Sequence, residues 1–525
     1  MTQPFSRRAF LQLAGALGGS AAVYRTAYGL GLMPAGPGTG KPDLAPLPRT
    51  GRKSVVILGA GIGGLTAAYE LSRKGYDVQV LEASHRAGGR NLTVRSGDLV
   101  DEVGSPQVCR FDRDPDLYFN AGPARIPGHH TALLGYCRDL GVELAPFINE
   151  NRNAWVQDDS TNGGKPLRNR EYATDTRGFV AELVAKSMNP AHFDADLTPD
   201  DLARLREFFR QFGELDADFR YKGSSRAGLA SHDYTSPAKL KVPAGFKELL
   251  HSPILSTLNF GDSYDQSAML MEPVGGMDRI VTAFMAKVGR LVRTHAIVER
   301  ITLKDGSVEV AYRHNGRPQV ASADYCLNSI PSHLLAGIEH NFPTEYATGL
   351  AAIPRGKLSK IGLQAKERFW ERDGIYGGIS WTMQDITQIW YPAHGIHRQK
   401  GIVLGLYNFN DAVGEKLGRM THEQRMELAL SQGEKVHPEY RSQIESGVSV
   451  VWHRMNHMLG CSARWNDELR KRWYARLQAP VGNHYLIGDQ MSYHPGWQEG
   501  AIHSAFHALA DIDRRVRAGQ ARVPA

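Results

Sequence analysis

The chain has 525 residues, enough for two or three domains that each bury a core. Its hydrophobic share of 42% and charged share of 22% are ordinary for a soluble globular protein. Three leader arginines contribute to the formal net charge of +7, and the remaining +4 is too small and dispersed to indicate nucleic-acid binding. The four cysteines are widely spaced without a C-x-x-C pair, which disfavours a cysteine metal site or a disulfide framework.

An export signal is predicted at the start of the chain. Arg7 and Arg8 precede a weakly hydrophobic, Gly/Ala-rich segment that ends near Val23. This pattern resembles a bacterial twin-arginine signal, which implies contact with that export machinery and a periplasmic or secreted protein. The segment is too short and glycine-rich for a stable membrane span, and a disordered basic tail is the alternative. Residues 33–49, rich in Gly and Pro, are predicted to be a linker.

A βαβ unit is predicted between Val55 and Glu82. The apolar run 55–58 enters a glycine turn, a helical pattern follows, and a second apolar run ends at Glu82. Such glycines let the backbone approach a pyrophosphate and let the helix pack closely on the strand, while the acid binds ribose hydroxyls. The helix start also favours phosphate, so the unit predicts a dinucleotide site. The glycines are Gly59, Gly61, Gly63 and Gly64.

The residues after Glu82 indicate which nucleotide binds. Ala83 follows directly, and Gly88-Gly89-Arg90 comes a few residues later. Together they resemble the fingerprint of the flavin amine oxidase superfamily, in which the nucleotide is FAD. The resemblance implies that Gly88-Gly89 lets the backbone run close to the pyrophosphate and that Arg90 supplies a cation.

A second match, at residues 121–130, narrows the family. It is similar to the segment of L-amino-acid oxidases in which an arginine binds the substrate carboxylate. Arginine suits this task because its planar fork can hold a carboxylate through two hydrogen bonds. Arg125 is therefore the predicted carboxylate ligand. The cofactor contacts implied for this segment are Gly122, Pro123, Ala124 and Arg125.

The middle of the chain, residues 172–260, has a polar helical pattern. Apolar residues such as Leu202, Phe208 and Phe212 recur at helix spacing. The family resemblance implies a helical domain along the route to the active site. We interpret the aromatic stripe itself as core.

A β-hairpin is predicted at residues 297–312, which alternate about Asp305-Gly306. The resemblance places Val298 beside the FAD adenine. The cofactor domain is therefore expected to be discontinuous, with other segments inserted between its pieces.

A lysine near the flavin is implied by the family match of residues 357–378. Lys360 aligns with the lysine that holds a water near flavin N5, and Lys357 is the competing candidate. Positive charge there can help reduced flavin react with oxygen, because it stabilises developing superoxide or peroxide.

Two aromatic residues are implied near the substrate and the flavin. Tyr391 lies in a segment resembling the one whose tyrosine hydroxyl assists the carboxylate arginine; the alternative is a half-buried strand residue. Trp452 falls where the family places a tryptophan beside the flavin, with an ordinary core tryptophan as the alternative.

The C-terminal block is a predicted strand that ends in Gly488-Asp489, then a loop and a helix. In the family the acid binds ribityl hydroxyls, and the helix dipole stabilises negative charge on the reduced ring. Asp489 is shorter than the glutamate common in relatives, so its carboxylate reaches less far toward the ribityl hydroxyls. Gly496-Trp497 matches the pair beside the substrate amino group. The implied cofactor contacts are Gly488, Asp489, Gln498, Ala501 and Ile502.

The expected fold class is α/β, with a discontinuous Rossmann-like FAD-binding domain, a mixed-sheet substrate domain and a helical domain. The expected divisions are the signal and linker in 1–40, the FAD-binding domain in 41–100, 269–353 and 479–525, the substrate-binding domain in 101–165 and 354–478, and the helical domain in 166–268.

The resemblance implies an FAD-dependent L-amino-acid oxidase. Arg125 and Tyr391 would hold the carboxylate, Trp497 would flank the amine, and hydride would leave Cα for flavin N5. Oxygen would then yield hydrogen peroxide, with a 2-oxo acid and ammonia as the other products. We assign no side-chain base, and interpret His129 and His130 as solvated. The alternatives are a decarboxylating L-amino-acid 2-monooxygenase, an amine oxidase or dehydrogenase that ignores the carboxylate, and a redox-silent flavin-binding subunit.

Three further properties are expected. Cys461 lies well before the C-terminal flavin motif, so FAD is predicted to bind noncovalently. Relatives commonly form dimers, which makes a homo-oligomer the expectation. No residue identifies the preferred substrate side chain; an acid in the pocket would favour Lys or Arg, and a dry aromatic lining large neutral substrates. The segment Gly104 to Asn120 has no assigned role.

Overall fold

The structure is a computed structural model that describes residues 40–47, 52–189, 197–231, 235–252, 254 and 257–520. The predicted twin-arginine signal lies outside the described residues. None of the helices in the described ranges combines the length and apolar character needed to cross a membrane.

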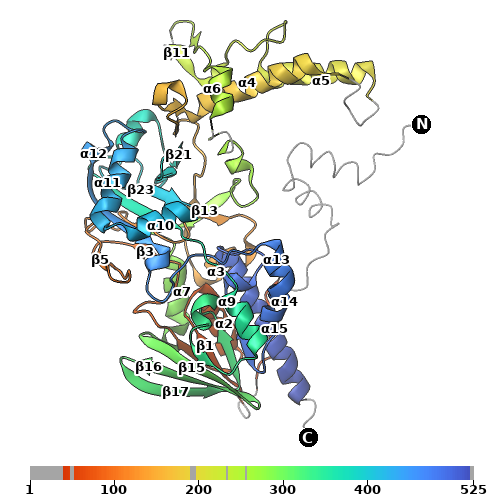
Figure 1. The fold of residues 1–525 in the computed structure, drawn as a ribbon, viewed down its shortest axis with the longest axis vertical. Helices are drawn as coiled ribbons and strands as arrows, with labels where there is room; N and C mark the ends of the chain where they lie inside the picture. Colours follow the sequence, from red (N-terminus) through yellow and green to blue (C-terminus); the bar gives the residue numbers. More distant parts are fainter. Residues whose placement is uncertain are drawn as a thin grey trace.

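A five-stranded parallel sheet forms the centre of the lower body in Figure 1, in the order β14-β2-β1-β18-β25. The strands β1 and β18 are almost wholly buried, as expected for a sheet covered on both faces. These strands come from three distant parts of the chain, so the predicted discontinuous α/β architecture is confirmed. Their bounds are β1 Ser54–Leu58, β2 Asp77–Leu81, β14 Val292–Arg293, β18 Tyr325–Asn328 and β25 His484–Leu486.

Four helices pack into one apolar core with this sheet. Helix α2 contacts both α7 and α15, and α3 also contacts α15. The helix starts of α2 and α15 both lie at the carboxyl ends of parallel strands, where α/β sheets bind their ligands. The bounds are α2 Ile62–Arg73, α3 Thr131–Leu140, α7 Arg279–Val288 and α15 Gln498–Gln520.

A four-stranded sheet flanks the parallel one, in the order β17-β16-β15-β19. Its strands β15 and β16 pair in antiparallel fashion around Asp305-Gly306, where Gly306 has a positive φ of 70°. The predicted hairpin is therefore confirmed. The bounds are β15 Ala296–Lys304, β16 Ser307–His314, β17 Arg317–Ala323 and β19 Glu339–His340.

A seven-stranded mixed sheet forms the middle body, in the order β10-β9-β21-β22-β23-β20-β24. One face packs under helices α10, α11 and α12, and the other faces a second apolar cluster that reaches the cavity described below. The strands are β9 Trp155–Gln157, β10 Leu167–Arg168, β20 Ser359–Ala365, β21 Gly378–Thr382, β22 Gln388–Tyr391, β23 Gly401–Asn408 and β24 Ile444–Val451. The helices are α10 Asp411–Arg419, α11 His422–Gly433 and α12 Tyr440–Gln443.

Short elements connect these bodies. A three-stranded sheet, β7-β13-β8, joins the segment after Arg125 to the chain that leaves the helical part. The remaining strands are β3 Thr93–Val94, β4 Leu99–Val100, β5 Gln107–Val108, β6 Phe119–Asn120, β7 Ile126–Pro127, β8 Leu144–Pro146, β11 Leu229–Ser231, β12 Lys239–Leu240 and β13 Leu270–Pro273. The small helices are α8 Ser332–Leu335, α9 Thr344–Ala351, α13 Asp467–Leu469 and α14 Ala475–Gln478.

The helical part, α4 Asn169–Ser187, α5 Pro199–Gly213 and α6 Phe246–His251, stands at the top of Figure 1, where α5 extends away from the body. Thr198 caps α5 by accepting a hydrogen bond from the Asp201 backbone N–H. Phe208 and Phe212 are 51% and 41% exposed, so the interpretation of this stripe as core is wrong. The reason is that α5 packs chiefly on α4 and has no second layer on its other side within the described residues.

Candidate active site

A cavity of about 1060 Å³ lies at the carboxyl ends of β1 and β2 and continues beneath the seven-stranded sheet. Its volume exceeds the range of about 300–1000 Å³ that is usual for small-ligand sites, which suits a dinucleotide together with a substrate. We call the part lined by the glycine turn the cofactor end, and the part around Arg125 and Lys360 the substrate end.

The glycine turn shapes the cofactor end through its backbone. A Cβ at Gly61 would meet nothing within 4 Å, so a ligand can approach the chain closely there. A Cβ at Gly64 would lie 2.0 Å from the carbonyl oxygen of Gly59. Gly64 does not line the cavity and allows close packing of α2 on β1; its contact with the cofactor stays a prediction.

Glu82 presents a buried carboxylate to the cofactor end. Its oxygens accept hydrogen bonds from the backbone N–H groups of Ala60 (2.7 Å) and Ser84 (2.9 Å). Burial raises the pKa of Glu82, although these two hydrogen bonds oppose the shift. The backbone therefore fixes the orientation of an acid where ribose hydroxyls are expected.

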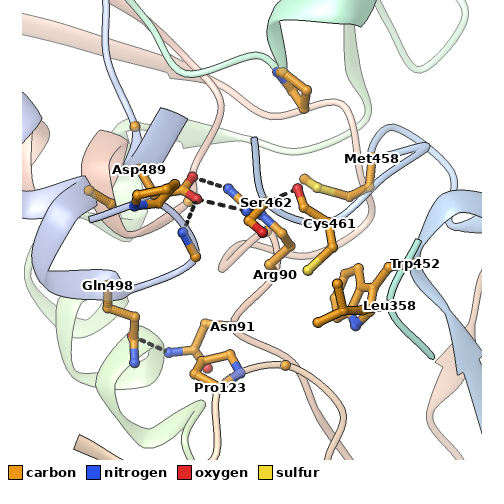
Figure 2. A pocket seen from close by; sticks show the side chains of 18 of the residues that line it. Arg90, Asn91, Pro123, Leu358, Trp452, Met458, Cys461, Ser462, Asp489 and Gln498 are labelled. Atoms are coloured by element: carbon orange, nitrogen blue, oxygen red, sulfur yellow. Dashed lines mark hydrogen bonds and ion pairs between the residues drawn. The ribbon is translucent and has the colours of Figure 1, made fainter. Parts of the chain in front are cut away.

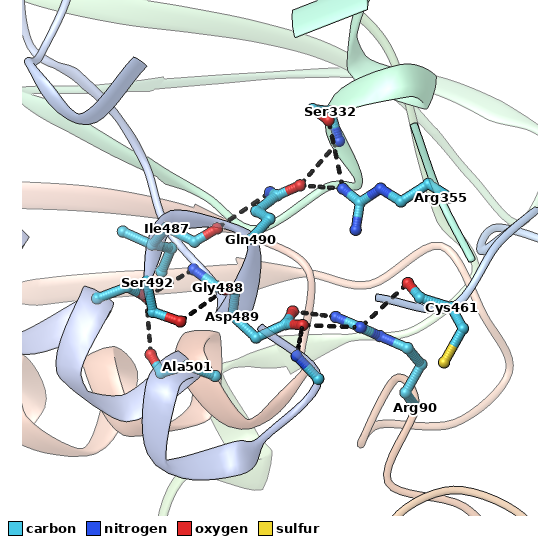
Figure 3. A network of polar contacts seen from close by, with 12 residues as sticks. Arg90, Ser332, Arg355, Cys461, Ile487, Gly488, Asp489, Gln490, Ser492 and Ala501 are labelled. Carbon is cyan, nitrogen blue, oxygen red and sulfur yellow. Dashed lines mark hydrogen bonds and ion pairs between the residues drawn. The ribbon is translucent and has the colours of Figure 1, made fainter. Parts of the chain in front are cut away.

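Arg90, whose side chain is 26% exposed, and the buried Asp489 form an ion pair rather than acting separately (Figures 2 and 3). Arg90 Nη1 lies 2.9 Å from Asp489 Oδ2 and 3.1 Å from the Cys461 carbonyl oxygen, and Asp489 also accepts from the Gly496 N–H at 2.7 Å. Burial opposes both charges, yet the pairing raises the pKa of Arg90 and lowers that of Asp489. Both residues line the cavity, but the charge expected at Arg90 is neutralised by its partner.

A second polar link stiffens the loop after β25 (Figure 3). Gln490 donates to the Ile330 carbonyl oxygen at 3.0 Å and accepts from the Ser332 N–H at 2.9 Å. The Arg355 guanidinium also hydrogen-bonds to Gln490. These contacts join the end of β18 to the Gly488-Asp489 loop, so the cofactor end is held by groups from several segments.

Arg125 is the buried cation of the substrate end. Its Nε donates to Gln266 Oε1 at 2.8 Å, and its guanidinium lies 4.8 Å from the Trp390 ring and 5.6 Å from the Trp497 ring. Within the described residues no carboxylate lies at ion-pair distance from Arg125, although the Asp265 charge raises the Arg125 pKa from farther away. Burial lowers its pKa, which shows the cost of keeping this charge out of water.

Lys360 projects from β20 into the same end. Its Nζ donates to the backbone carbonyl oxygens of Gly122 (2.5 Å) and Asn120 (3.2 Å). Burial, with a smaller contribution from the Arg125 charge, lowers its pKa to about 7. The competing Lys357 pairs with Glu415 at the surface and does not line the cavity. Of the two lysines, the structure places only Lys360 at the site.

Tyr391 does not reach the cavity, so its predicted role at the substrate carboxylate was wrong. Its hydroxyl bonds to Ser380 Oγ at 2.7 Å and His437 Nε2 at 2.6 Å, under helix α11. Alternate residues of a strand face opposite sides, and on β22 it is Gln388 and Trp390 that face the substrate end. The alternative, a strand residue without a role at the carboxylate, is the correct one, although Tyr391 is buried rather than half-buried.

Tyr407 on β23 is a cavity tyrosine that the sequence interpretation missed. It pairs across strands with Lys360, and the Lys360 Nζ lies 4.3 Å from its ring centroid. A register shift at Gly405 turns it inward, so that it faces the same side as Leu404 three residues earlier. Burial raises its pKa to about 12, against the nearby Arg125 charge, so its hydroxyl is a neutral donor.

The C-terminal pair Gly496-Trp497 lines the cavity as predicted, with Gly496 at a φ of 89°. Ile502 does not line it, because the side chain is fully buried in the core of the parallel sheet; its contact with the cofactor stays a prediction. Gln498 and Ala501 lie about one turn apart on the face of α15 that lines the cavity. The opposite face of the helix packs into the core.

The other predicted site residues all line the cavity. Trp452 also donates its Nε1–H to the Ala121 carbonyl oxygen at 3.1 Å, and Gln498 accepts from Asn91 at 2.8 Å (Figure 2). The full set is Gly59, Gly61, Gly63, Glu82, Ala83, Gly89, Arg90, Gly122, Pro123, Ala124, Arg125, Val298, Lys360, Trp452, Gly488, Asp489, Gly496, Trp497, Gln498 and Ala501.

Cys461 also lines the cavity, contrary to the expectation from its place in the sequence. Figure 2 shows it between Arg90 and Trp452. Burial raises the pKa of its thiol, which keeps the sulfur protonated and a poor nucleophile. The premise that this cysteine lies far from the flavin site was wrong, whereas its chemistry still favours noncovalent binding.

The residues present fit a flavin dinucleotide: an open backbone cradle at Gly61, a fixed acid at Glu82 and a helix start at Gln498. The fold and cavity therefore define a flavin-dependent oxidoreductase of the α/β class. The model of the flavin-containing amine oxidoreductase family matches residues 62–512, and the chain belongs to this family. FAD is its cofactor.

Similar proteins agree with this assignment. The flavin-dependent L-tryptophan oxidase RebO of Lentzea aerocolonigenes is 28% identical over 500 residues, covering 90% of this chain and 99% of that protein. The L-amino acid oxidase Cdc18 of Crotalus durissus cumanensis is 26% identical, covering 88% and 90%. Cyclohexylamine oxidase from Brevibacterium oxydans IH-35A shares the fold, with a TM-score of 0.58 at 18% identity and coverage of 89% and 100%.

Proposed function

We propose that the protein oxidises L-amino acids with FAD and oxygen to imino acids and hydrogen peroxide, and that water hydrolyses the imino acids to 2-oxo acids and ammonia. The observation that carries the proposal is the buried Arg125, a cation in the cavity without an ion-pair partner among the described residues. A buried charge is costly unless an anion or strong hydrogen bonds compensate it. A substrate carboxylate would provide that anion, whereas a simple amine would not.

The roles of the cavity residues follow from their positions. Arg125 would grip the carboxylate, and the neutral hydroxyl of Tyr407 would donate to it in the place first expected for Tyr391. Trp497 and Gly496 would flank the amino group. When bound, FAD supplies the two-electron acceptor of the reaction. Lys360 would hold positive charge where oxygen is reduced.

The substrate side chain is proposed to be large and neutral. Aromatic rings of Phe260, Trp381, Tyr407 and Phe409 line the substrate end. The cavity carboxylates are Glu82 and Asp489, both engaged at the cofactor end. A substrate with a cationic side chain would find no free acid among the described lining residues, while an apolar or aromatic side chain would bury its surface against these rings.

A peroxide-coupled screen of the twenty L-amino acids on the purified holoenzyme tests this proposal. We expect the highest kcat/KM for aromatic and large aliphatic substrates, and little activity with lysine or aspartate. Anaerobic addition of the best substrate should bleach the flavin absorbance. Retention of full flavin colour with every amino acid would reject an oxidase and favour a redox-silent subunit.

Other sequence predictions belong to this proposal. The Arg7-Arg8 segment would direct export by the twin-arginine route, and the chain would form a homo-oligomer with the domain divisions given above. FAD would be released by acid precipitation into a colourless pellet and a yellow supernatant. A yellow pellet would instead indicate a bond to protein, with Cys461 as the cavity thiol to test first.

A further inference from the structure

Three histidines and one aspartate converge behind Trp497, outside the walls of the cavity. The Oδ1 atom of Asp265 lies 2.9 Å from His129 Nε2, 3.4 Å from His130 Nε2 and 3.2 Å from His494 Nε2. The Nε2 atoms of His130 and His494 lie 3.3 Å apart. The last two rings also pack against the Trp497 indole. The sequence interpretation of His130 as solvated was wrong, since this residue is 1% exposed.

Hydrogen bonding alone does not account for this arrangement. Three imidazole nitrogens point at a single carboxylate oxygen, which has two lone pairs to offer. If His130 and His494 both donated to Asp265, their N–H groups would also crowd each other. The Nδ1 of His130 is buried and finds no partner in the described part of the chain, so this ring makes its polar contacts through Nε2. A cation that accepts a lone pair from each ligand would remove both conflicts.

We propose that His130, Asp265 and His494, with His129 beside them on Asp265, form a binding site for a divalent transition metal, with zinc as the reference ion. Ligand atoms about 2.0–2.1 Å from a tetrahedral zinc lie roughly 3.4 Å from one another. The three distances among His130, Asp265 and His494 are 3.2, 3.3 and 3.4 Å, while His129 lies 2.9 Å from Asp265. The ligand atoms of His129, His130 and Asp265 all lie within 4.8 Å of one another. Imidazole ligands favour zinc, cobalt, nickel or copper over magnesium and calcium.

The ligands sit next to the residues that form the substrate end. His129 and His130 follow Arg125 across β7, Asp265 directly precedes Gln266, and His494 lies just before Gly496-Trp497. A metal would therefore tie together three segments that are distant in sequence. Each of these segments contributes residues around Arg125. The metal would therefore fix the position of the carboxylate-binding arginine and would take no part in the redox chemistry.

The site is reachable from solvent. The side chains of His129 and His494 are 29% and 34% exposed, while that of His130 is 2% exposed. A metal can enter on the exposed side and meet the buried ligand last. Binding requires neutral imidazoles, so the affinity should fall in acid as the histidines are protonated.

Zinc titration of the FAD-loaded protein tests the site without any substrate, so the outcome does not depend on the proposed reaction. The protein is first treated with chelator, and any polyhistidine tag is removed. Isothermal titration calorimetry should then show one Zn²⁺ per chain. Asp265→Asn and His130→Gln should each weaken binding at least about 100-fold. His251→Gln, which alters an exposed histidine on α6, should bind zinc like the unaltered protein.

Cobalt gives a second readout. Co²⁺ in a tetrahedral nitrogen and oxygen site should add visible bands beyond the flavin absorbance, and Zn²⁺ should displace them. If Asp265→Asn does not fold, His494→Asn on the exposed side provides the same comparison. Absence of stoichiometric zinc binding in the unaltered protein, or undiminished binding in the ligand variants, would overturn the proposal and leave a hydrogen-bonded histidine cluster.

Discussion

The two ends of the cavity treat buried charge in opposite ways. At the cofactor end, Arg90 is paired with Asp489, and both are held by backbone groups. At the substrate end, Arg125 and Lys360 are buried with only neutral hydrogen-bond acceptors around them. A paired site is complete before its ligand arrives, whereas an unpaired cation is stabilised only when an anion or a developing negative charge is bound. The cofactor end is therefore suited to holding the cofactor, and the substrate end to selecting the substrate and to the reaction.

The strongest test of the paired end is Arg90→Met. Removing one partner leaves the Asp489 carboxylate buried and uncompensated, which should cost about 3–5 kcal/mol of folding free energy. Denaturant unfolding of the apoprotein measures it. The matched control is Lys357→Met, which breaks the exposed pair with Glu415 and should cost less than about 1 kcal/mol. Equal losses in the two variants would show that the Arg90 pair is no more important than a surface contact.

Lys360→Met tests the unpaired end during reoxidation. The Lys360 pKa of about 7 means that its positive charge is present at lower pH and is lost as pH rises through that value. The rate constant of the reduced enzyme with oxygen should therefore fall across neutral pH. The variant should be about 10²–10³-fold slower at low pH and lack this dependence. Stopped-flow reoxidation measures both. A variant that reacts with oxygen as fast as the unaltered enzyme would remove Lys360 from this role.

Arg125→Met tests the same end during substrate binding. Loss of the guanidinium should cost about 2–4 kcal/mol of transition-state binding, roughly 30- to 1000-fold in kcat/KM. The ratio of kcat/KM for an amino acid to that for its decarboxylated amine should fall toward one. Unchanged efficiency with amino acids would indicate an amine oxidase that ignores the carboxylate.

The cofactor end was largely predictable because its requirements are read from short, contiguous patterns. The positions of Gly61 and Glu82 relative to the strand and helix fix what the backbone can do, whatever the rest of the chain does. Gly64 and Ile502 lie outside the cavity lining, since a residue inside a binding motif can serve packing. A family match identifies the motif but does not separate packing from contact.

The substrate end was less predictable because it depends on which way strand residues face. A one-residue difference moves a side chain to the other side of a sheet, so Trp390 faces Arg125 and Tyr391 faces away. The bulge at Gly405 brings Tyr407 inward against simple alternation from Leu404. Such a bulge is set by pairing with β20, which the local sequence does not reveal. The convergence of distant histidines on Asp265 has the same origin in tertiary structure.

The prediction with the smallest expected effect compares substitutions of two buried tyrosines, Tyr407 and Tyr391. Tyr407→Phe removes a neutral donor beside the expected carboxylate, which should cost about 1.5–3 kcal/mol in kcat/KM, roughly 10- to 150-fold. Tyr391→Phe breaks its hydrogen bonds with Ser380 and His437, so it should lower stability by about 1 kcal/mol while leaving kcat/KM nearly unchanged. Steady-state kinetics and thermal unfolding of both variants separate the two effects. The reverse result, with kcat/KM lost in Tyr391→Phe alone, would mean that substrate binding rearranges β22, and that the carboxylate is recognised from the strand face now covered by α11.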